Sequence, residues 1–181
     1  MKFEKICVLG LGYIGLPTAS MFAANGIQVL GVDVNPRVIE TLRRGELHIY
    51  EPGLRGLVEQ ALASGNLAFA LQPEPADAFI ISVPTPFYDD KRADLSYVSA
   101  AAEAILPALR KGSLVVLEST SPPRTTVDVV APILSRSGLK AGEDYLLAYS
   151  PERVLPGQIL KELVENARVI GGMNPASAEA G

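Results

Sequence analysis

Short apolar runs rich in β-branched residues alternate along this chain with longer stretches of helical period. The apolar runs lie near residues 4–9, 28–33, 67–70, 78–83, 113–118, 145–149 and 168–171. The spacing of apolar residues predicts helices over 14–25, 36–44, 53–63, 95–110 and 123–136. Strands and helices that alternate in this way build a parallel sheet with helices on both faces. We therefore predict an α/β fold of the doubly wound Rossmann type.

Glycine placement supports the predicted helix ends. A glycine follows each of the five predicted helices within a few residues, at Gly26, Gly45, Gly65, Gly112 and Gly138. Helices often end on a residue in the left-handed conformation, which glycine adopts without steric cost. The one long polar loop that we expect covers residues 84–94.

Composition excludes several classes of protein. The 181 residues carry a net charge of -4, so a basic surface for nucleic acid is not expected. No apolar stretch reaches membrane-spanning length, and the N-terminus lacks the apolar core of a signal peptide, so we predict a cytoplasmic protein without a membrane partner. Cys7 is the only cysteine and lies in an apolar run, where we expect it to fill the core. We predict no metal site.

The segment GLGYIG carries the first functional signal. Gly10, Gly12 and Gly15 form a G-x-G-x-x-G pattern between a predicted strand and a predicted helix, with Tyr13 and Ile14 inside the turn. In this context the first glycine permits the tight turn, the second lets backbone approach a pyrophosphate, and the third lets helix pack on strand. We predict that these five residues bind a dinucleotide.

An acidic residue follows at the distance that such a motif requires. Asp33 ends the second predicted strand, about 20 residues after the glycines. A carboxylate there accepts hydrogen bonds from a free ribose 2′-hydroxyl and repels a 2′-phosphate, which favours NAD over NADP. Arg37 is the opposing signal, because an arginine can bind a 2′-phosphate. We give Asp33 more weight and expect Arg37 to lie against the adenosine.

Two further strand ends carry hydroxyl groups. Residues 82–86 (SVPTP) and 118–122 (ESTSP) each follow an apolar run. Ligands of doubly wound sheets lie at the carboxyl ends of strands, so these segments are expected to meet the nicotinamide half of the cofactor. For Ser119 and Ser121, helix capping is an equally acceptable interpretation.

Seven ordered blocks resemble the N-terminal domain of the UDP-glucose/GDP-mannose dehydrogenase family, and together they span nearly the whole chain. The blocks are GLGYIGLP, VDVN, GELHIYEPGL, VPTPF, LESTSPP, YSPERVLPG and RVIGG. Within the family, GELHIYEP and SPERVLPG favour the branch that acts on UDP-N-acetyl-D-mannosamine, with UDP-glucose or another nucleotide sugar as the alternative substrate.

The resemblance implies an enzyme that oxidises the C6 alcohol of a UDP-sugar to a carboxylate with two NAD. It also implies that a cysteine nucleophile and basic groups come from a second domain, so this chain alone is expected to be inactive. Residues 1–173 are then the NAD-binding domain. Residues 174–181, with Asn174 as N-cap and Pro175 at the first helical position, would start a linker helix of a longer protein that forms a homodimer or a larger oligomer.

Family motifs also imply roles for individual residues. Gly10, Gly12, Gly15 and Asp33 match the NAD-binding positions, as do Pro84, Thr85 and Thr120 near the nicotinamide ribose. Thr120 further matches a threonine that positions the catalytic water. Glu152 matches an acid/base glutamate at the junction of cofactor and sugar.

The segment SPERVLPG would then meet the substrate. Arg153, Val154 and Leu155 follow Glu152 in a loop bounded by prolines. Arg153 is expected to pair with Glu152 or to reach a phosphate. Pro156 departs from the glucose-type enzymes, which have a second glutamate there, so their scheme of water activation does not transfer. For the single histidine, His48, we favour a structural or substrate-loop position over a catalytic base.

Two other interpretations stay open at this point. One alternative is a non-catalytic NAD-binding module. The other is a domain of another Rossmann oxidoreductase, such as a hydroxyacid dehydrogenase. The first predicts no dependence on nucleotide sugars, and the second predicts that small acids replace UDP-sugars as substrates.

Overall fold

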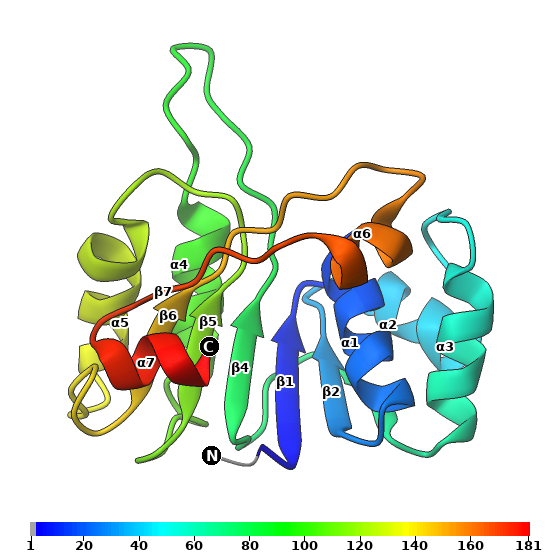
Figure 1. Ribbon diagram of the computed structural model, residues 1–181, viewed down its shortest axis with the longest axis horizontal. Coiled ribbons are helices and arrows are strands. Elements are labelled where there is room, and N and C mark those ends of the chain that lie inside the picture. The colour runs from blue at the N-terminus through cyan, green and yellow to red at the C-terminus, as the bar shows by residue number, and fades with distance from the viewer. Residues whose placement is uncertain (1–2) are drawn as a thin grey trace.

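A computed structural model describes residues 3–181 and contains one seven-stranded sheet of order β3-β2-β1-β4-β5-β6-β7 (Figure 1). The first six strands in sequence pair in parallel, and only β7 runs antiparallel to its neighbour β6. Their bounds are β1 Lys5–Leu9, β2 Gln28–Val32, β3 Leu67–Ala70, β4 Ala78–Ile81, β5 Leu114–Leu117, β6 Leu146–Tyr149 and β7 Gly171–Gly172. The predicted Rossmann-type α/β fold is confirmed.

Helices cover both faces of the sheet. They are α1 Gly15–Ala24, α2 Pro36–Arg43, α3 Leu54–Ala63, α4 Ser96–Ile105, α5 Ala131–Ser135, α6 Ile159–Glu165 and α7 Pro175–Ala180. One buried cluster joins the sheet to α1, α2 and α3, and a second cluster on the opposite face joins it to α4 and α5. Every residue of β4 and β5 is buried. Because alternate strand residues point to opposite faces, both faces of these two strands lie in the core.

Two predicted helices are shorter than expected, and both contain proline. The helix predicted over 95–110 ends at Ile105, because Pro107 has no N–H to continue the ladder. The helix predicted over 123–136 begins as a π-turn, Thr126–Val130, before α5. Pro132 lies at this change and cannot donate to an α-helical bond.

Two C-terminal elements differ more from expectation. The strand predicted over 168–171 is wrong in position, since β7 pairs only at Gly171 and Gly172. Helix α6 was not predicted; it has only seven residues, and the contacts that fix it come from a distant loop.

Several local predictions hold. The five glycines expected after helices all have positive φ. Asn174 caps α7, where its Oδ1 accepts the Ser177 N–H at 2.8 Å. The polar segment between β4 and α4 projects beyond the sheet (Figure 1). Within residues 3–181 there is no helix with the length and hydropathy that a bilayer crossing requires.

Cys7 lies in β1 with no exposed surface, and burial raises the pKa of its thiol to about 12. Because the thiolate is the reactive form, we expect the native protein to resist an aromatic disulfide reagent at pH 8 and to react fully once unfolded in urea. Absorbance of the released thiol measures this. Rapid labelling of the native chain would contradict the burial of Cys7.

Candidate active site

The carboxyl ends of the parallel strands meet at one edge of the sheet, and the glycine turn lies at its centre. Gly10 follows β1 with φ +91°, and its N–H donates to the Val32 carbonyl at 2.8 Å. A Cβ at Gly10 would come within 2.6 Å of the Ser82 carbonyl oxygen. The turn therefore requires glycine for both its conformation and its contact with the end of β4.

The other two glycines of the motif have different surroundings. Gly15 is the first residue of α1, and a Cβ there would overlap the Gly10 carbonyl oxygen. A Cβ at Gly12 would meet no protein atom within 4 Å. No contact within residues 3–181 therefore requires glycine at position 12. A phosphate lying against the backbone would require it, because a side chain there would occupy the same space.

The first turn of α1 presents polar groups to this open space. Ile14 is the N-cap residue, and no side chain caps the helix. Tyr13 is half exposed within the turn. The free amide groups and the helix dipole at such a terminus favour an anion.

Asp33 lies beside the turn at the end of β2. Its Oδ2 accepts the Leu11 N–H at 3.0 Å, and its Oδ1 accepts the Asn35 N–H at 2.9 Å. A carboxylate has about four acceptor sites, so capacity remains for ribose hydroxyls. A cavity of about 290 Å³ opens next to it and extends to Pro84 and Tyr97. Arg37 lies exposed at the start of α2 and does not line this cavity.

A second cavity of about 280 Å³ lies on the other side of the glycine turn. Ile14, Thr85, Thr120, Glu152 and Val154 are among its lining residues. The Thr85 hydroxyl donates to the Thr120 carbonyl at 2.6 Å, and the Thr120 hydroxyl donates to the Glu152 carbonyl at 3.3 Å. The structure thus brings together residues from the ends of β4, β5 and β6 that the sequence placed in one site.

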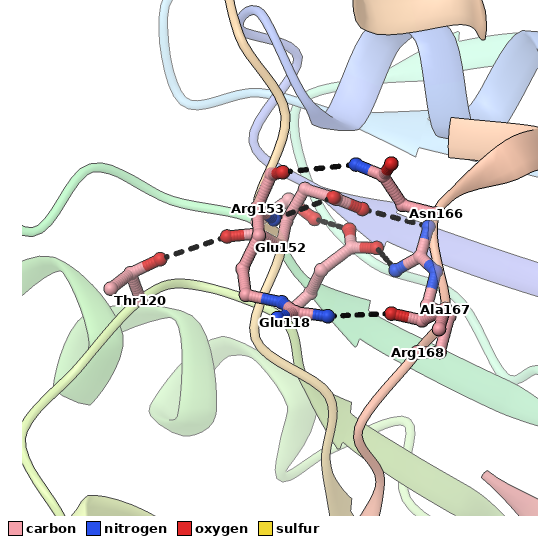
Figure 2. Close-up of polar contacts among 8 residues, drawn as sticks. Glu118, Thr120, Glu152, Arg153, Asn166, Ala167 and Arg168 are labelled. Carbon is pink, nitrogen blue, oxygen red and sulfur yellow. Dashed lines mark hydrogen bonds and ion pairs between the residues drawn. The ribbon is translucent and has the colours of Figure 1, made fainter. Parts of the chain in front are cut away.

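Glu152 has a buried carboxylate, with 7% of its side chain exposed. Its Oε1 accepts the Arg153 backbone N–H at 2.6 Å, while its Oε2 lies 2.7 Å from Nη2 of Arg168 (Figure 2). The expected pairing of the Arg153 side chain with Glu152 is wrong. The Arg153 guanidinium instead donates to the Ala167 carbonyl at 2.6 Å, just beyond the end of α6.

Glu118 is a second buried carboxylate that sequence reasoning missed as a site residue. The Ser82 hydroxyl donates to its Oε2 at 2.5 Å, and Arg168 Nη1 donates to its Oε1 at 3.2 Å. Burial, partly offset by Ser82 and Arg168, raises the pKa of this carboxyl group. Its place in the segment ESTSP, directly after a buried strand, was the available signal.

The loop of residues 151–158, which follows β6, is held by a third buried carboxylate. Glu51 accepts the Gly157 N–H at 2.8 Å and the Ile159 N–H at 2.9 Å, which caps the start of α6. Leu155, within this loop, is 62% exposed. His48 lies nearby, and its Nε2 is 2.8 Å from the Leu11 carbonyl, so Nε2 carries the proton and donates. This bond to the glycine turn agrees with a structural role for His48.

Ser119 and Ser121, for which the sequence allowed either a ligand contact or helix capping, differ in their hydrogen bonds. The Ser119 hydroxyl donates to the Val83 carbonyl at 2.8 Å, so it ties the ends of β4 and β5 together rather than capping a helix. The Ser121 hydroxyl is buried and makes no hydrogen bond within the described chain.

Comparison with known proteins assigns a family to this arrangement. The model of the UDP-glucose/GDP-mannose dehydrogenase family, NAD binding domain, matches residues 4–181. The chain belongs to this family. Its cofactor is therefore NAD, as the sequence predicted, and the open space over Gly12 together with the Asp33 carboxylate fits that dinucleotide.

Relatives resemble the chain over nearly all of its length. NDP-N-acetyl-D-galactosaminuronic acid dehydrogenase from Ralstonia nicotianae is 51% identical over 99% of this chain and 44% of its own length. UDP-N-acetyl-D-mannosamine dehydrogenase from Campylobacter jejuni is 50% identical over 98% of this chain and 46% of its own length.

A solved structure gives the same result. UDP-N-acetyl-mannosamine dehydrogenase from Staphylococcus aureus matches with a TM-score of 0.94 and 50% identity over 97% of this chain and 43% of that chain. The chain thus spans less than half the length of the relatives that it matches.

We expect Asp33→Ala to weaken NAD⁺ binding by roughly 10- to 100-fold, because each lost hydrogen bond to a charged group contributes about 1.5–3 kcal/mol. The variant should also lose its preference for NAD⁺ over NADP⁺. Titration calorimetry with both cofactors measures the two effects, and a urea melt checks that the Leu11 contact does not carry the change. Equal NAD⁺ affinity in variant and wild type would contradict the ribose assignment.

Proposed function

We propose that this chain is the cofactor-binding part of an NAD-dependent nucleotide-sugar 6-dehydrogenase that oxidises UDP-N-acetyl-D-mannosamine to UDP-N-acetyl-D-mannosaminuronate with two NAD. The observation that carries the proposal is the convergence of Thr85, Thr120 and Glu152 in one cavity beside the glycine turn. NAD, when bound, accepts the hydride in each oxidation. The protein must then orient the alcohol carbon and receive the hydroxyl proton.

We assign those tasks to particular residues. Gly10, Gly12 and Gly15 form the pyrophosphate cradle with Tyr13 and Ile14 at its rim, and Asp33 binds the adenosine ribose with Arg37 beside it. Pro84, Thr85 and Thr120 face the nicotinamide ribose, and Thr120 positions water. Glu152 acts as acid/base, because it lies at the junction of the cofactor cavity and the loop that contains Arg153, Val154 and Leu155.

The sugar oxidised is the finer part of the proposal. Relatives at 50% and 51% identity are named for N-acetylmannosamine and for N-acetylgalactosaminuronic acid. The blocks GELHIYEP and SPERVLPG favour N-acetylmannosamine. The Ralstonia relative is the reason to keep N-acetylgalactosamine, whose C6 oxidation would give that uronic acid, as the alternative. Comparing kcat/KM for UDP-N-acetyl-D-mannosamine, UDP-N-acetyl-D-galactosamine and UDP-glucose with the full-length protein decides between them.

A second domain would supply the nucleophile. Cys7 is fully buried in β1 and cannot reach the sugar. Beside α7, a cavity of about 520 Å³ extends from Gly181 to α1 and is lined mainly by apolar side chains such as Phe22, Ile80 and Val116. We propose that α7 continues as a linker helix that covers these groups and leads to the second domain and to a homodimer or larger oligomer.

This division of the site has a direct consequence for the 181-residue chain. We expect it to bind NAD⁺ yet to produce no NADH from any UDP-sugar, because the second domain would supply both the basic groups needed for the first oxidation and the thiolate needed for the second. Absorbance at the NADH band over hours measures turnover, with calorimetry on the same sample as the control for a folded cofactor site. Steady NADH production would contradict a nucleophile from outside the chain.

A further inference from the structure

Arg168 lies between two buried carboxylates that follow different strands. Its Nη1 donates to Glu118 at 3.2 Å, and its Nη2 lies 2.7 Å from Glu152 (Figure 2). We propose that Arg168 is a positioning residue that fixes Glu152 at the cavity edge and couples its charge to that of Glu118. The functional meaning of this coupling rests on the proposed role of Glu152 beside the sugar.

The geometry favours one shared cation over two separate ion pairs. Glu118 follows β5, Glu152 follows β6, and Arg168 precedes β7, so no local turn forces the three side chains together. The planar guanidinium presents separate N–H groups to separate acceptors, which a lysine ammonium cannot do with the same directionality. Both carboxylates have at most 7% of their side chain exposed, while a third of the Arg168 side chain is exposed.

Other contacts restrain the backbone of the same cluster. The Glu152 N–H donates to the Glu118 carbonyl at 3.2 Å. The Asn166 side chain donates to the Arg153 carbonyl at 3.2 Å, and the Arg153 side chain donates to the Ala167 carbonyl (Figure 2). The two residues that directly precede Arg168 are therefore both hydrogen-bonded to Arg153, which holds the segment with Arg168 against the loop that contains Glu152.

The charges of Glu118, Glu152 and Arg168 do not balance when both acids are ionised. Two carboxylates and one guanidinium leave a net charge of -1 when both acids are ionised. The charged groups that face Glu118 are Arg168 and Glu152, and Ser82 adds a hydroxyl donor. Arg153 does not join this set, since its guanidinium turns to a carbonyl. Close carboxylates repel each other, so the Glu152 charge disfavours the ionised form of Glu118 and helps to raise the pKa of the Glu118 carboxyl group.

One oxygen distinguishes the cluster from a fully satisfied structural network. Oε2 of Glu152 is buried and close to Arg168, yet no hydrogen bond of good geometry reaches it from the described residues. Buried polar atoms in proteins are normally hydrogen-bonded. An acceptor held by charge but not by an aligned donor keeps the capacity to receive a proton or a substrate hydroxyl.

The test follows the Glu118 carboxyl carbon by ¹³C NMR as pH is raised, in the 181-residue chain labelled at glutamate and assigned with Glu118→Gln. We expect Glu152→Gln to lower the midpoint of this titration, because a like charge is lost, and Arg168→Gln to raise it, because the cation is lost. Arg168→Lys should give an intermediate midpoint. Lys161→Gln is the matched control and should leave the midpoint unchanged, since it removes an exposed cation of α6 that pairs with Glu165 and not with Glu118.

An unchanged midpoint in Glu152→Gln would overturn the coupling, and this result does not depend on whether Arg168→Gln folds. A midpoint that shifts equally in Lys161→Gln and Arg168→Gln would overturn the specific role of Arg168. Calorimetry with NAD⁺ on the same samples separates this proposal from the proposed function. If NAD⁺ still binds but the Glu118 midpoint does not respond to Glu152→Gln, only the role of Arg168 is contradicted.

Discussion

We expect Gly15→Ala to destabilise the protein by roughly 3 kcal/mol and to abolish NAD⁺ binding. The added methyl group would overlap the Gly10 carbonyl oxygen, which is backbone and cannot rotate away. Overpacking of this kind costs about 1–3 kcal/mol or more, against a total stability on the order of 5–15 kcal/mol. Urea unfolding followed by circular dichroism measures the loss, and calorimetry measures the binding.

Two other glycines provide matched controls for this result. Gly12→Ala should unfold at the wild-type urea concentration yet bind NAD⁺ weakly, because only a ligand crowds that position. Gly56→Ala lies within α3 with open space around it, and should be slightly stabilising, by about 0.5–1 kcal/mol. A Gly15→Ala variant as stable as wild type would show that the turn is not packed as described.

We expect Glu51→Ala to be the most damaging change outside the glycine turn. It would leave the Gly157 and Ile159 amides without their charged acceptor in an interior where Glu51 is only 5% exposed. An unsatisfied buried group costs about 1–3 kcal/mol, so the loss is roughly 2–6 kcal/mol for the two donors. Helix α6 should fray, and the loop that contains Glu152 should become mobile.

Hydrogen exchange identifies this effect residue by residue. The amides of Gly157 and Ile159 should lose their protection in Glu51→Ala, while amides of β1 keep theirs. Glu59→Ala serves as the control, because Glu59 is exposed on α3 and its pair with Arg55, at 3.9 Å, contributes little. Retained protection at Gly157 would contradict the capping role of Glu51.

The sequence predicted those parts of the site that local patterns determine. The alternation of strands and helices, the glycine turn and Asp33 each depend on residues close in sequence, and the structure places Thr85, Thr120 and Glu152 together because parallel strands end at one edge. In contrast, the hydrogen bond between the Glu51 carboxylate and the first amide of α6 joins residues more than one hundred positions apart. No periodicity signals such a contact.

The sequence also did not reveal that Arg168, rather than Arg153, is the ionic partner of Glu152. Adjacency in the chain suggested that Arg153 neutralises Glu152, but neighbouring side chains in an extended loop point in different directions. Arg168 reaches Glu152 because β7 runs antiparallel beside β6 and returns the chain to the same edge. The sequence predicted a strand near 168–171 but contained no signal for its direction or its length.

The most direct test of the proposed function is the stoichiometry of oxidation by the full-length protein. Purified enzyme is mixed with a limiting amount of UDP-N-acetyl-D-mannosamine and excess NAD⁺, and NADH is measured at completion. We expect two NADH for each sugar and a uronate product by mass spectrometry. One NADH for each sugar, or none with any nucleotide sugar, would contradict the proposed function and would leave the chain as an NAD-binding module of another kind.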